Sequence, residues 1–401
     1  MVQHPQRRLS RIARLPRRAV PAPPEWARRG PFRAGAFPSP VRSERLTTRL
    51  GIALGTAVAV CFVTGLISHY IQHPVWWFAW PSRPVSLYRI TQGLHVGSGL
   101  AAVPLLLAKL AAAYPRLYAW PPVRDLAHAV ERLTVAALVG AVIFQLATGI
   151  LNISLWYGAM PFSFITTHYW TAWIAAGALL IHIGVKLPVI RRALARSPAA
   201  VDPGRRGVLL GVAAAVGVVT VTTVGQTVRP LAPLGVLAPR RPDIGPQGLP
   251  VNKSAVAARV VEAARDPTYR LMVNGPGDAR LLSLADLDGI RQHTVRLPIS
   301  CVEGWSADAE WTGVRLSDLL DLVDAAPDVA ISVESLQPRG KFRASRIGPP
   351  HSRDPLTLVA LRLNGEPLHL DHGYPCRLIA PNRPGVLQTK WLARLTVEVT
   401  R

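Results

Sequence analysis

The stretch Phe162–Leu187, FSFITTHYWTAWIAAGALLIHIGVKL, is predominantly apolar and carries two histidines, His168 and His182. An α-helix of about 20 such residues crosses the hydrocarbon core of a bilayer, so we predict a transmembrane helix here. Four other stretches have the same character: Leu50–Tyr70, Leu87–Ala113, Leu133–Leu155 and Val208–Val228. The chain is therefore predicted to cross a lipid bilayer with a bundle of apolar helices.

The charge distribution predicts the orientation of these helices. The 401-residue chain has a net charge of +23, and its Lys and Arg residues concentrate in Arg7–Arg49 and Lys186–Arg206, which flank apolar runs. The charge does not gather on one binding face, so we predict no nucleic-acid partner. Basic loops alternate with neutral ones, and basic loops remain in the cytoplasm. We predict a multi-pass plasma-membrane protein with a cytoplasmic N-terminus and an extracytoplasmic region after Val228.

Histidines within the predicted helices indicate bound metal groups, because ionisable residues in a bilayer usually have a function. His168 and His182 are fourteen residues apart, a spacing that advances about 21 Å and ends about 40° short of four turns. Both rings therefore leave one helix face, which predicts two haem b groups stacked across the membrane. His95 is the predicted partner of His168, and His128 the candidate partner of His182. His69 could replace His95, bind a quinone head group or contact water.

The remaining sequence suggests how the chain is divided. Residues 1–45 are predicted to be a disordered basic cytoplasmic arm, 46–190 a four-helix transmembrane cytochrome b domain, 205–228 a fifth transmembrane helix, 229–253 a linker rich in Pro and Gly, and 254–401 an extracytoplasmic α+β domain. The fifth helix begins GRRGVLLG (Gly204–Gly211), which is either a cytoplasmic anchor or a twin-arginine export signal.

The α+β prediction for the last region rests on short β-like runs. These runs are Thr268–Gly275, Thr294–Ser300, Val329–Leu336, Leu358–Gly365, Cys376–Pro381 and Arg394–Thr400, with a helical run at Leu316–Val323. A basic stretch, PRGKFRASR (Pro338–Arg346), could line a pocket for an oxyanion or simply face solvent.

The chain has three cysteines and no CxxC pair, so neither a disulfide framework nor a structural zinc site is predicted. Cys301 stands in SCVEGW (Ser300–Trp305) between a β-like run and a segment rich in Gly, Trp and acidic residues. A thiolate is a soft ligand for a transition metal, whereas a buried thiol without a neighbouring base is often inert. The thiol alone leaves both interpretations open.

The segments around Cys301 resemble the sulfite oxidase family of molybdopterin enzymes. SCVEGW, WTG (Trp311–Gly313), NGEPL (Asn364–Leu368), DHGYPCRL (Asp371–Leu378) and TKW (Thr389–Trp391) occur in the order and at spacings similar to those of the family. The resemblance implies a molybdenum-molybdopterin cofactor with Cys301 as the thiolate ligand to molybdenum. It implies that His372, Arg377 and Lys390 contact the pterin, and Ser300, beside the ligand, is included among the cofactor-binding residues.

The first half of the chain, from about Leu46 to Leu187, resembles the four-helix b-type cytochromes of membrane oxidoreductases, such as cytochrome b561 and the membrane subunit of formate dehydrogenases. The resemblance implies haem ligation by histidines of the bundle and exchange of electrons with quinone. This sequence departs from the formate dehydrogenase type because His69 lies at the outer end of its helix.

Together these features predict a membrane-bound molybdenum oxidoreductase of one chain. Electrons would pass between an extracytoplasmic molybdenum site and the membrane quinone pool through b-type haems, with oxygen-atom transfer to or from a small oxo-anion or an S- or N-oxide. The direction of flow, the substrate within that class and the oligomeric state stay open. The alternative is an extracytoplasmic binding or sensory module, anchored by a membrane bundle, without redox activity.

Overall fold

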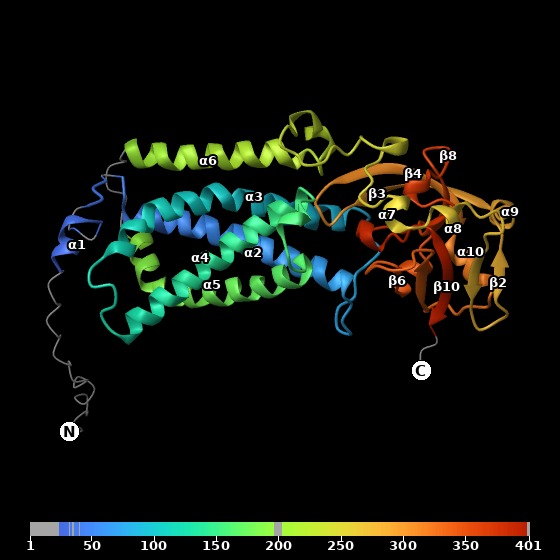
Figure 1. The fold of residues 1–401 in the computed structure, drawn as a ribbon, viewed down its shortest axis with the longest axis horizontal. Helices are drawn as coiled ribbons and strands as arrows, with labels where there is room; N and C mark the ends of the chain where they lie inside the picture. The colour runs from blue at the N-terminus through green and yellow to red at the C-terminus, as the bar shows by residue number, and fades with distance from the viewer. Residues whose placement is uncertain (1–23, 32, 34–35, 40, 196–202, 399–401) are drawn as a thin grey trace, which may run out of the picture.

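The computed structural model describes residues 24–31, 33, 36–39, 41–195 and 203–398, which form a helical part and a sheet-containing part placed end to end (Figure 1). The helical part contains five long apolar helices, each long enough to cross a membrane. They are α2 (Glu44–Gln72), α3 (Leu87–Ala113), α4 (Leu126–Ile153), α5 (Phe164–Ala195) and α6 (Pro203–Val224). The predicted set of five apolar helices is thereby confirmed.

Local capping explains where these helices differ from the predicted spans. Asp125 accepts a hydrogen bond from the backbone N–H of His128 at 2.7 Å, so α4 begins at Leu126 rather than at Leu133 and His128 lies in its first turn. The fifth helix ends at Val224, four residues before the predicted Val228. The chain turns at Gly225, where a Cβ would lie 2.5 Å from the carbonyl oxygen of Leu231.

Part of the predicted basic arm lies outside the described residues, namely 1–23 and 32, 34, 35 and 40. The described part of the arm is not wholly irregular, because Glu25–Arg29 forms the short helix α1. Ser43 caps α2 by accepting a hydrogen bond from the backbone N–H of Leu46 at 3.1 Å. The first long helix therefore begins inside the arm.

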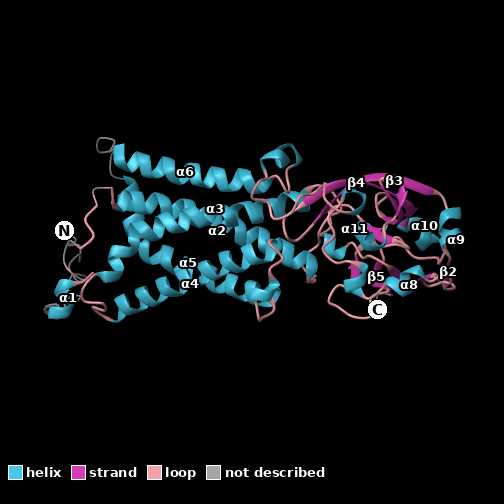
Figure 2. Cartoon of the chain, turned by 45° about the horizontal axis from the view of Figure 1, so that its top comes forward, coloured by secondary structure: helices cyan, strands magenta, loops and turns pink. Residues whose placement is uncertain are grey.

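The long helices pack as a bundle of four with α6 on its outside. Helix α2 packs against α3, α4 against α5, and α6 runs along α3 (Figures 1 and 2). The small apolar cluster in the middle of the bundle contains Leu106, Ala141, Val142 and Ala175 from three helices. The sheet-containing part lies at the end of the bundle where α2 and α4 end and α3 and α5 begin (Figure 1).

The C-terminal part is α+β, with two five-stranded sheets. The first sheet has the order β2-β1-β10-β5-β6; in the second, β3-β4-β7-β8 are neighbours and β9 also pairs with β7. The strands are β1 (Leu271–Asn274), β2 (Arg280–Leu282), β3 (Gln292–Ser300), β4 (Ser306–Arg315), β5 (Ala330–Ser335), β6 (Ala344–Ile347), β7 (Leu358–Leu363), β8 (Glu366–Pro367), β9 (Arg377–Ile379) and β10 (Leu392–Glu398). All six predicted β-like runs contain a strand.

Short helices and turns connect the strands. The helices are α7 (Ala255–Ala258), α8 (Val261–Arg265), α9 (Leu284–Gly289), α10 (Leu316–Asp321) and α11 (Pro349–Ser352). The 3-10 turns are η1 (Tyr114–Tyr118), η2 (Tyr157–Ala159), η3 (Arg229–Leu234), η4 (Pro246–Gly248), η5 (Leu370–His372) and η6 (Gly385–Leu387). Two of these turns, η3 and η4, lie in the predicted linker, whose Leu249 is 2% exposed and packs in a core cluster. The end of the linker is thus part of the domain.

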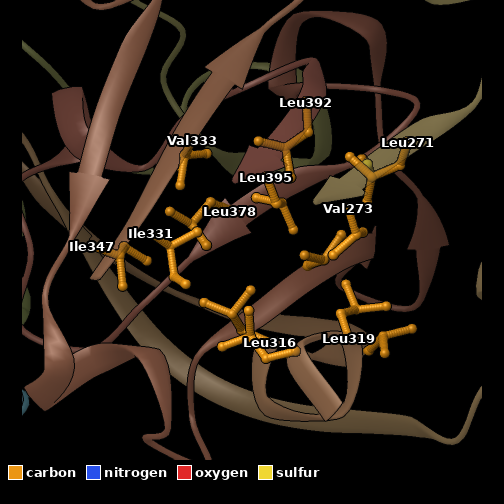
Figure 3. Packing of buried hydrophobic residues seen from close by; sticks show 14 of the residues in the cluster. Leu271, Val273, Leu316, Leu319, Ile331, Val333, Ile347, Leu378, Leu392 and Leu395 are labelled. Atoms are coloured by element: carbon orange, nitrogen blue, oxygen red, sulfur yellow. The ribbon is translucent and has the colours of Figure 1, made fainter. Parts of the chain in front are cut away.

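The main core lies between the two sheets and α10. Leu271, Val273, Ile331, Val333 and Leu395 come from the first sheet, and Leu316 and Leu319 come from α10 (Figure 3). On β5 and β10 these side chains alternate with polar residues, as expected when one face of a strand is buried. Burial of this apolar surface fixes the pairing of the sheets, and with it the loops at their edges.

We predict that Leu319→Ala lowers the free energy of unfolding of this domain by about 2–5 kcal/mol, because it leaves a cavity in the core. Leu319 is fully buried, whereas Leu281 on β2 is 60% exposed. Thermal denaturation of the purified full chain in detergent, followed by tryptophan fluorescence, measures the change. Leu281→Ala is the matched control, and an equal loss of stability in both variants would contradict this description of the core.

Candidate functional site

Cys301 lies in the tight turn between β3 and β4. Its backbone N–H donates to the carbonyl oxygen of Trp305 at 2.9 Å, and the N–H of Gly304 donates to the Cys301 carbonyl at 3.0 Å. Gly304 has φ +93°, a conformation that favours glycine. The side chain of Cys301 is almost fully buried. The turn therefore holds the thiol in a fixed, dry position.

Asn252 and Glu303 complete the surroundings of this thiol. The Asn252 Nδ2 group donates to Cys301 Sγ at 3.0 Å and to Glu303 Oε2 at 2.9 Å. Burial raises the pKa of the Cys301 thiol above its usual range, and the nearby Glu303 carboxyl raises it further. A thiolate here therefore requires a compensating cation. Asn252 was not predicted, because it lies in the linker, 49 positions from Cys301.

A second loop, residues 380–388, lies against the Cys301 turn. Pro384 forms an isolated bridge with Ser300. A Cβ on Gly385 would lie 3.3 Å from the Ser300 carbonyl oxygen and 3.8 Å from Cα of Cys301. Gln388 closes the loop on itself: its Oε1 accepts from the N–H of Ala380 at 2.8 Å and its Nε2 donates to the Ala380 carbonyl at 2.9 Å. The loop is thus a rigid partner of the thiol.

Three cations lie in or beside this loop: Arg377 and Arg383 are buried, and Lys390 is partly buried. The guanidinium of Arg377 donates to the carbonyls of His372 at 2.9 Å and Gln388 at 3.0 Å, and that of Arg383 donates to the carbonyl of Arg346 at 3.0 Å. The ammonium of Lys390 donates to the carbonyls of Lys253 at 2.7 Å and Asp371 at 2.8 Å.

These cations lack an anionic partner. The ion pairs of the described chain give none of them a carboxylate, and the Nε atoms of Arg377 and Arg383 are buried without a hydrogen-bond partner. Burial lowers the pKa of Arg377 to about 9, of Arg383 to about 10 and of Lys390 to about 7. An anionic group bound among them would offset the free energy of burying the charges.

His372 and Ser300 are engaged locally. His372 Nε2 lies 2.6 Å from the carbonyl oxygen of Pro246, and burial lowers the pKa of His372 to about 4, so the ring is neutral and donates this hydrogen bond. The hydroxyl of Ser300 lies 2.8 Å from that of Ser306. Arg377 contacts the His372 carbonyl directly. Ser300 connects the Cys301 turn to β4 through Ser306.

The helical part is hydrogen-bonded to the loop of residues 380–388 through Asn382. The indole N–H of Trp80 donates to the Asn382 carbonyl at 2.8 Å, and the N–H of Tyr88 donates to its Oδ1 at 2.7 Å. Asn382 Nδ2 donates in turn to the carbonyl of Pro81 at 2.7 Å. Asn382 has φ +54°, which asparagine tolerates better than most residues. The loop beside Cys301 is thus fixed to the start of α3.

Two of the predicted histidines lie together inside the bundle. The ring centroids of His95 on α3 and His168 on α5 are 6.5 Å apart, with planes at 73°. His95 Nδ1 lies 2.8 Å from the carbonyl oxygen of Cys61, and His168 Nδ1 lies 3.1 Å from the hydroxyl of Thr148. The Nδ1 atoms are occupied, and Nε2 of each ring remains available.

The other histidines are arranged differently. Nδ1 of His128 accepts from the backbone N–H of Arg124 at 3.2 Å, within its own helix cap, and no ring contact joins His128 to His182 among the residues described. Nδ1 of His182 is buried without a hydrogen-bond partner. His69 stacks on His73 at 4.3 Å and on Tyr169 at 3.9 Å. The His128–His182 pair is therefore not preformed.

Comparison with known proteins supplies the identity of the C-terminal part. Residues 257–401 match the family model described as "Oxidoreductase molybdopterin binding domain". This region is a molybdopterin-binding oxidoreductase domain. Mitochondrial sulfite oxidase of Mus musculus is 33% identical over 162 residues, covering 33% of this chain and 30% of that protein. Nitrate reductase [NADH] of Ulva prolifera is 38% identical over 100 residues, covering 22% and 11%.

The solved structure of the sulfane dehydrogenase SoxCD from Paracoccus pantotrophus aligns with 33% of this chain and 38% of its own chain, at 25% identity and a TM-score of 0.29. The chain spans about 30% of the length of the sulfite oxidases that it matches. The predicted sulfite-oxidase-like molybdopterin domain is confirmed, and with it the oxidoreductase class. None of these matches covers the helical part with its histidines.

The residues of this molybdopterin domain fit such a cofactor. In the described chain no group of three or more His, Cys, Asp and Glu side chains could hold a metal ion, so a metal at Cys301 would need further ligands from a cofactor. A single buried thiol is suited to that role. The buried cations without carboxylates are suited to an anionic cofactor, because Arg and Lys bind phosphate through charge-assisted hydrogen bonds.

We predict that Arg383→Met lowers the molybdopterin content of the purified protein by about tenfold, because one charge-assisted hydrogen bond contributes about 1.5–3 kcal/mol. Fluorescence of the oxidised, released pterin measures the content. The matched control is Arg346→Met: Arg346 is half-exposed and pairs with Glu398 at 2.7 Å. Full pterin content in a folded Arg383→Met variant would show that Arg383 only stabilises the loop of residues 380–388 and does not bind the cofactor.

Proposed function

We propose that this protein is a membrane-bound molybdenum oxidoreductase that exchanges electrons between the molybdopterin domain and the quinone pool through haem in the helical bundle. One observation supports this most. The turn that carries Cys301 and the loop beside it lie against the beginning of α3, the helix that carries His95. A metal held by Cys301 and an iron held by His95 would then belong to adjoining parts of one chain.

In the molybdopterin domain, Cys301 would hold molybdenum, and Arg377, Arg383 and Lys390 would hold the anionic part of the pterin cofactor, with His372 and Ser300 beside them. When bound, this cofactor supplies oxygen-atom transfer coupled to a two-electron change. The chain excludes water from the thiol by burying it, and Asn252 orients the sulfur through the hydrogen bond at 3.0 Å. Together these residues would provide a dry, preorganised site.

The substrate we propose is a small oxo-anion or an S- or N-oxide. The relatives are named for sulfite and nitrate. Oxidation of a sulfite-type substrate with water releases two electrons and two protons, and reduction of an oxide consumes the same number. Within PRGKFRASR, Lys341 lies 3.0 Å from Nε2 of His73, and Arg346 pairs with Glu398. Neither contact favours this stretch as a pocket for the oxyanion.

In the helical bundle, His95 and His168 would hold a haem b through their Nε2 atoms. Their ring centroids lie 6.5 Å apart, close enough for both residues to hold one iron. Hydrogen bonds to Nδ1 orient such ligands, as the Cys61 carbonyl and Thr148 hydroxyl do here. A second haem at His182 would require His128 to leave its helix cap.

The proposed orientation has a cytoplasmic N-terminus and an extracytoplasmic molybdopterin domain in the plasma membrane. The end of α5, which carries Arg191 and Arg192, and the start of α6, which carries Arg205 and Arg206, lie at the end of the bundle remote from the domain (Figure 1), in keeping with basic loops in the cytoplasm. Tryptophans 76, 77 and 80 follow α2 at the other end, and tryptophan favours the membrane interface.

We expect Cys301→Ser to abolish molybdenum-dependent turnover and leave the reduced haem spectrum unchanged, because a hydroxyl replaces the soft thiolate ligand of molybdenum while the proposed iron ligands stay in place. Turnover with viologen or ferricyanide over a panel of sulfite and S- and N-oxides measures the first effect, and absorbance the second. Cys376→Ser is the control: Cys376 is a buried core thiol that contacts the Tyr269 hydroxyl at 3.2 Å. Undiminished turnover in Cys301→Ser would remove the metal role.

Replacing His168 with Ala is expected to remove one haem per chain, because the iron loses one of its two protein ligands. The pyridine haemochrome assay measures the haem content. His73→Ala is the control, since His73 lies after the end of α2 and outside the proposed pair. Full haem content in His168→Ala would exclude this residue as a ligand, and wild-type protein without haem or molybdenum would support a binding module instead.

A further inference from the structure

We propose that Gln92 is a positioning residue that fixes the Cys301 turn against α3, so that electrons cross between the two parts over a permanent contact close to His95. The inference rests on the proposed function, because it assumes a metal at Cys301 and a haem iron at His95. It addresses a point that the proposed function leaves open, namely how the two parts that would carry the redox centres are held together.

One face of α3 meets the Cys301 turn. The residues that contact the turn, or lie beside it, are Arg89, Gln92, Gly93 and Val96, and residues spaced by three, four and seven positions share a helix face. His95 follows Gln92 by three residues, about 4.5 Å along the helix axis, and directly precedes Val96. The contact therefore reaches the turn of α3 that carries the proposed iron ligand.

Gln92 makes the central contact of this face. It is 4% exposed, and its Nε2 group donates to the carbonyl oxygen of Val302, the residue after Cys301. A buried amide in an apolar helix is unfavourable unless it is hydrogen-bonded. Its single described partner is on the other part of the chain, and its Oε1 has none. Gln92 thus serves the contact between the parts and not the packing of the bundle.

Close packing reinforces this hydrogen bond. A Cβ on Gly304 would lie 2.6 Å from Cγ2 of Val96, so the turn approaches the helix at a distance that glycine alone permits. From the turn that follows α6, the hydroxyl of Thr227 donates to the carbonyl of Gly304, and the carbonyl of Gln226 accepts from the N–H of Ser306 at 2.8 Å. The Cys301 turn is therefore held by α3 and by the residues directly after α6.

Arg89 adds a charged contact at the edge of the same surface. Its Nε donates to the Ser306 hydroxyl at 2.7 Å and its Nη2 to Asp308 at 2.9 Å. The side chains of Arg89 and Asp308 are 19% and 28% exposed, so salt screens this pair only in part. The contact surface is mostly buried and hydrogen-bonded, as expected for a fixed interface.

The number of electrons in the reaction determines how many electron transfers must occur across this contact. Oxidation of one substrate molecule releases two electrons and two protons, and a haem iron accepts one electron at a time. Two successive one-electron transfers would therefore occur per turnover, and a quinone would take up both electrons with two protons to become quinol. For reduction of an S- or N-oxide, quinol is the reductant and every transfer runs the other way.

The test is the full chain with both cofactors, carrying Gln92→Met, which keeps the side-chain length and removes the donor. Loss of this hydrogen bond is expected to slow substrate-driven haem reduction, or oxidation by an oxide, by about tenfold, measured by stopped-flow absorbance of the haem. Turnover with an artificial electron carrier should fall less. Amide hydrogen exchange at residues 301–306 should rise, a readout independent of activity.

Thr91→Val is the matched control on the same helix, because the Thr91 hydroxyl donates to the carbonyl of Tyr88 at 3.1 Å, within its own helix. Thr227→Val is the second variant, which removes the hydrogen bond from the turn after α6 to Gly304 and should also slow electron transfer to or from the haem. If both Gln92→Met and Thr227→Val match wild-type haem kinetics and exchange, the inference is wrong while the proposed function stands. If wild-type haem never responds to substrate, the proposed function fails first.

Discussion

The contact between the β3–β4 turn and the beginning of α3 is the constraint on which the rest of this structure depends. It joins a water-excluded thiol to a long apolar helix through the Val302 carbonyl, the close approach of Gly304 and the hydrogen bonds of Asn382. A polar side chain inside an apolar bundle is tolerated when its partners are supplied from the same fold. Here those partners come from a domain more than 200 residues further along the chain.

The C-terminal domain buries positively charged side chains that have no carboxylate partner among the residues described, which favours the binding of an anionic group. Arg377 and Arg383 donate to backbone carbonyls and have no carboxylate partner among the residues described. Such an arrangement is unfavourable by itself and becomes favourable when an anion binds. An anionic cofactor bound there would also stabilise the loop that contains residues 380–388, and the same loop connects the domain to Trp80 and Tyr88.

The sequence could predict the features that depend on local composition. Hydropathy predicted the five apolar helices, and the motifs around Cys301 predicted the molybdopterin domain. Strand β4 was missed, because SADAEWTG is rich in acidic and small residues, although it is a central strand between β3 and β7. Asn252 and Gln92 were missed for another reason: their partners are 49 and 210 positions away. Matching positions along the apolar helices predicted that His95 and His168 lie together, and their ring centroids are 6.5 Å apart, whereas Nδ1 of His128 accepts a hydrogen bond from the backbone N–H of Arg124.

The short connection after α6 has a consequence for assembly. Helix α6 ends at Val224, and Gln226 and Thr227 already bond the β3–β4 turn. No flexible tether separates the last span from the surface that it serves, so the effective concentration of one part around the other is high. Two separate subunits would associate according to their abundance in the cell. In this chain both parts are synthesised as one polypeptide, so their ratio is always one to one, and dilution cannot separate them.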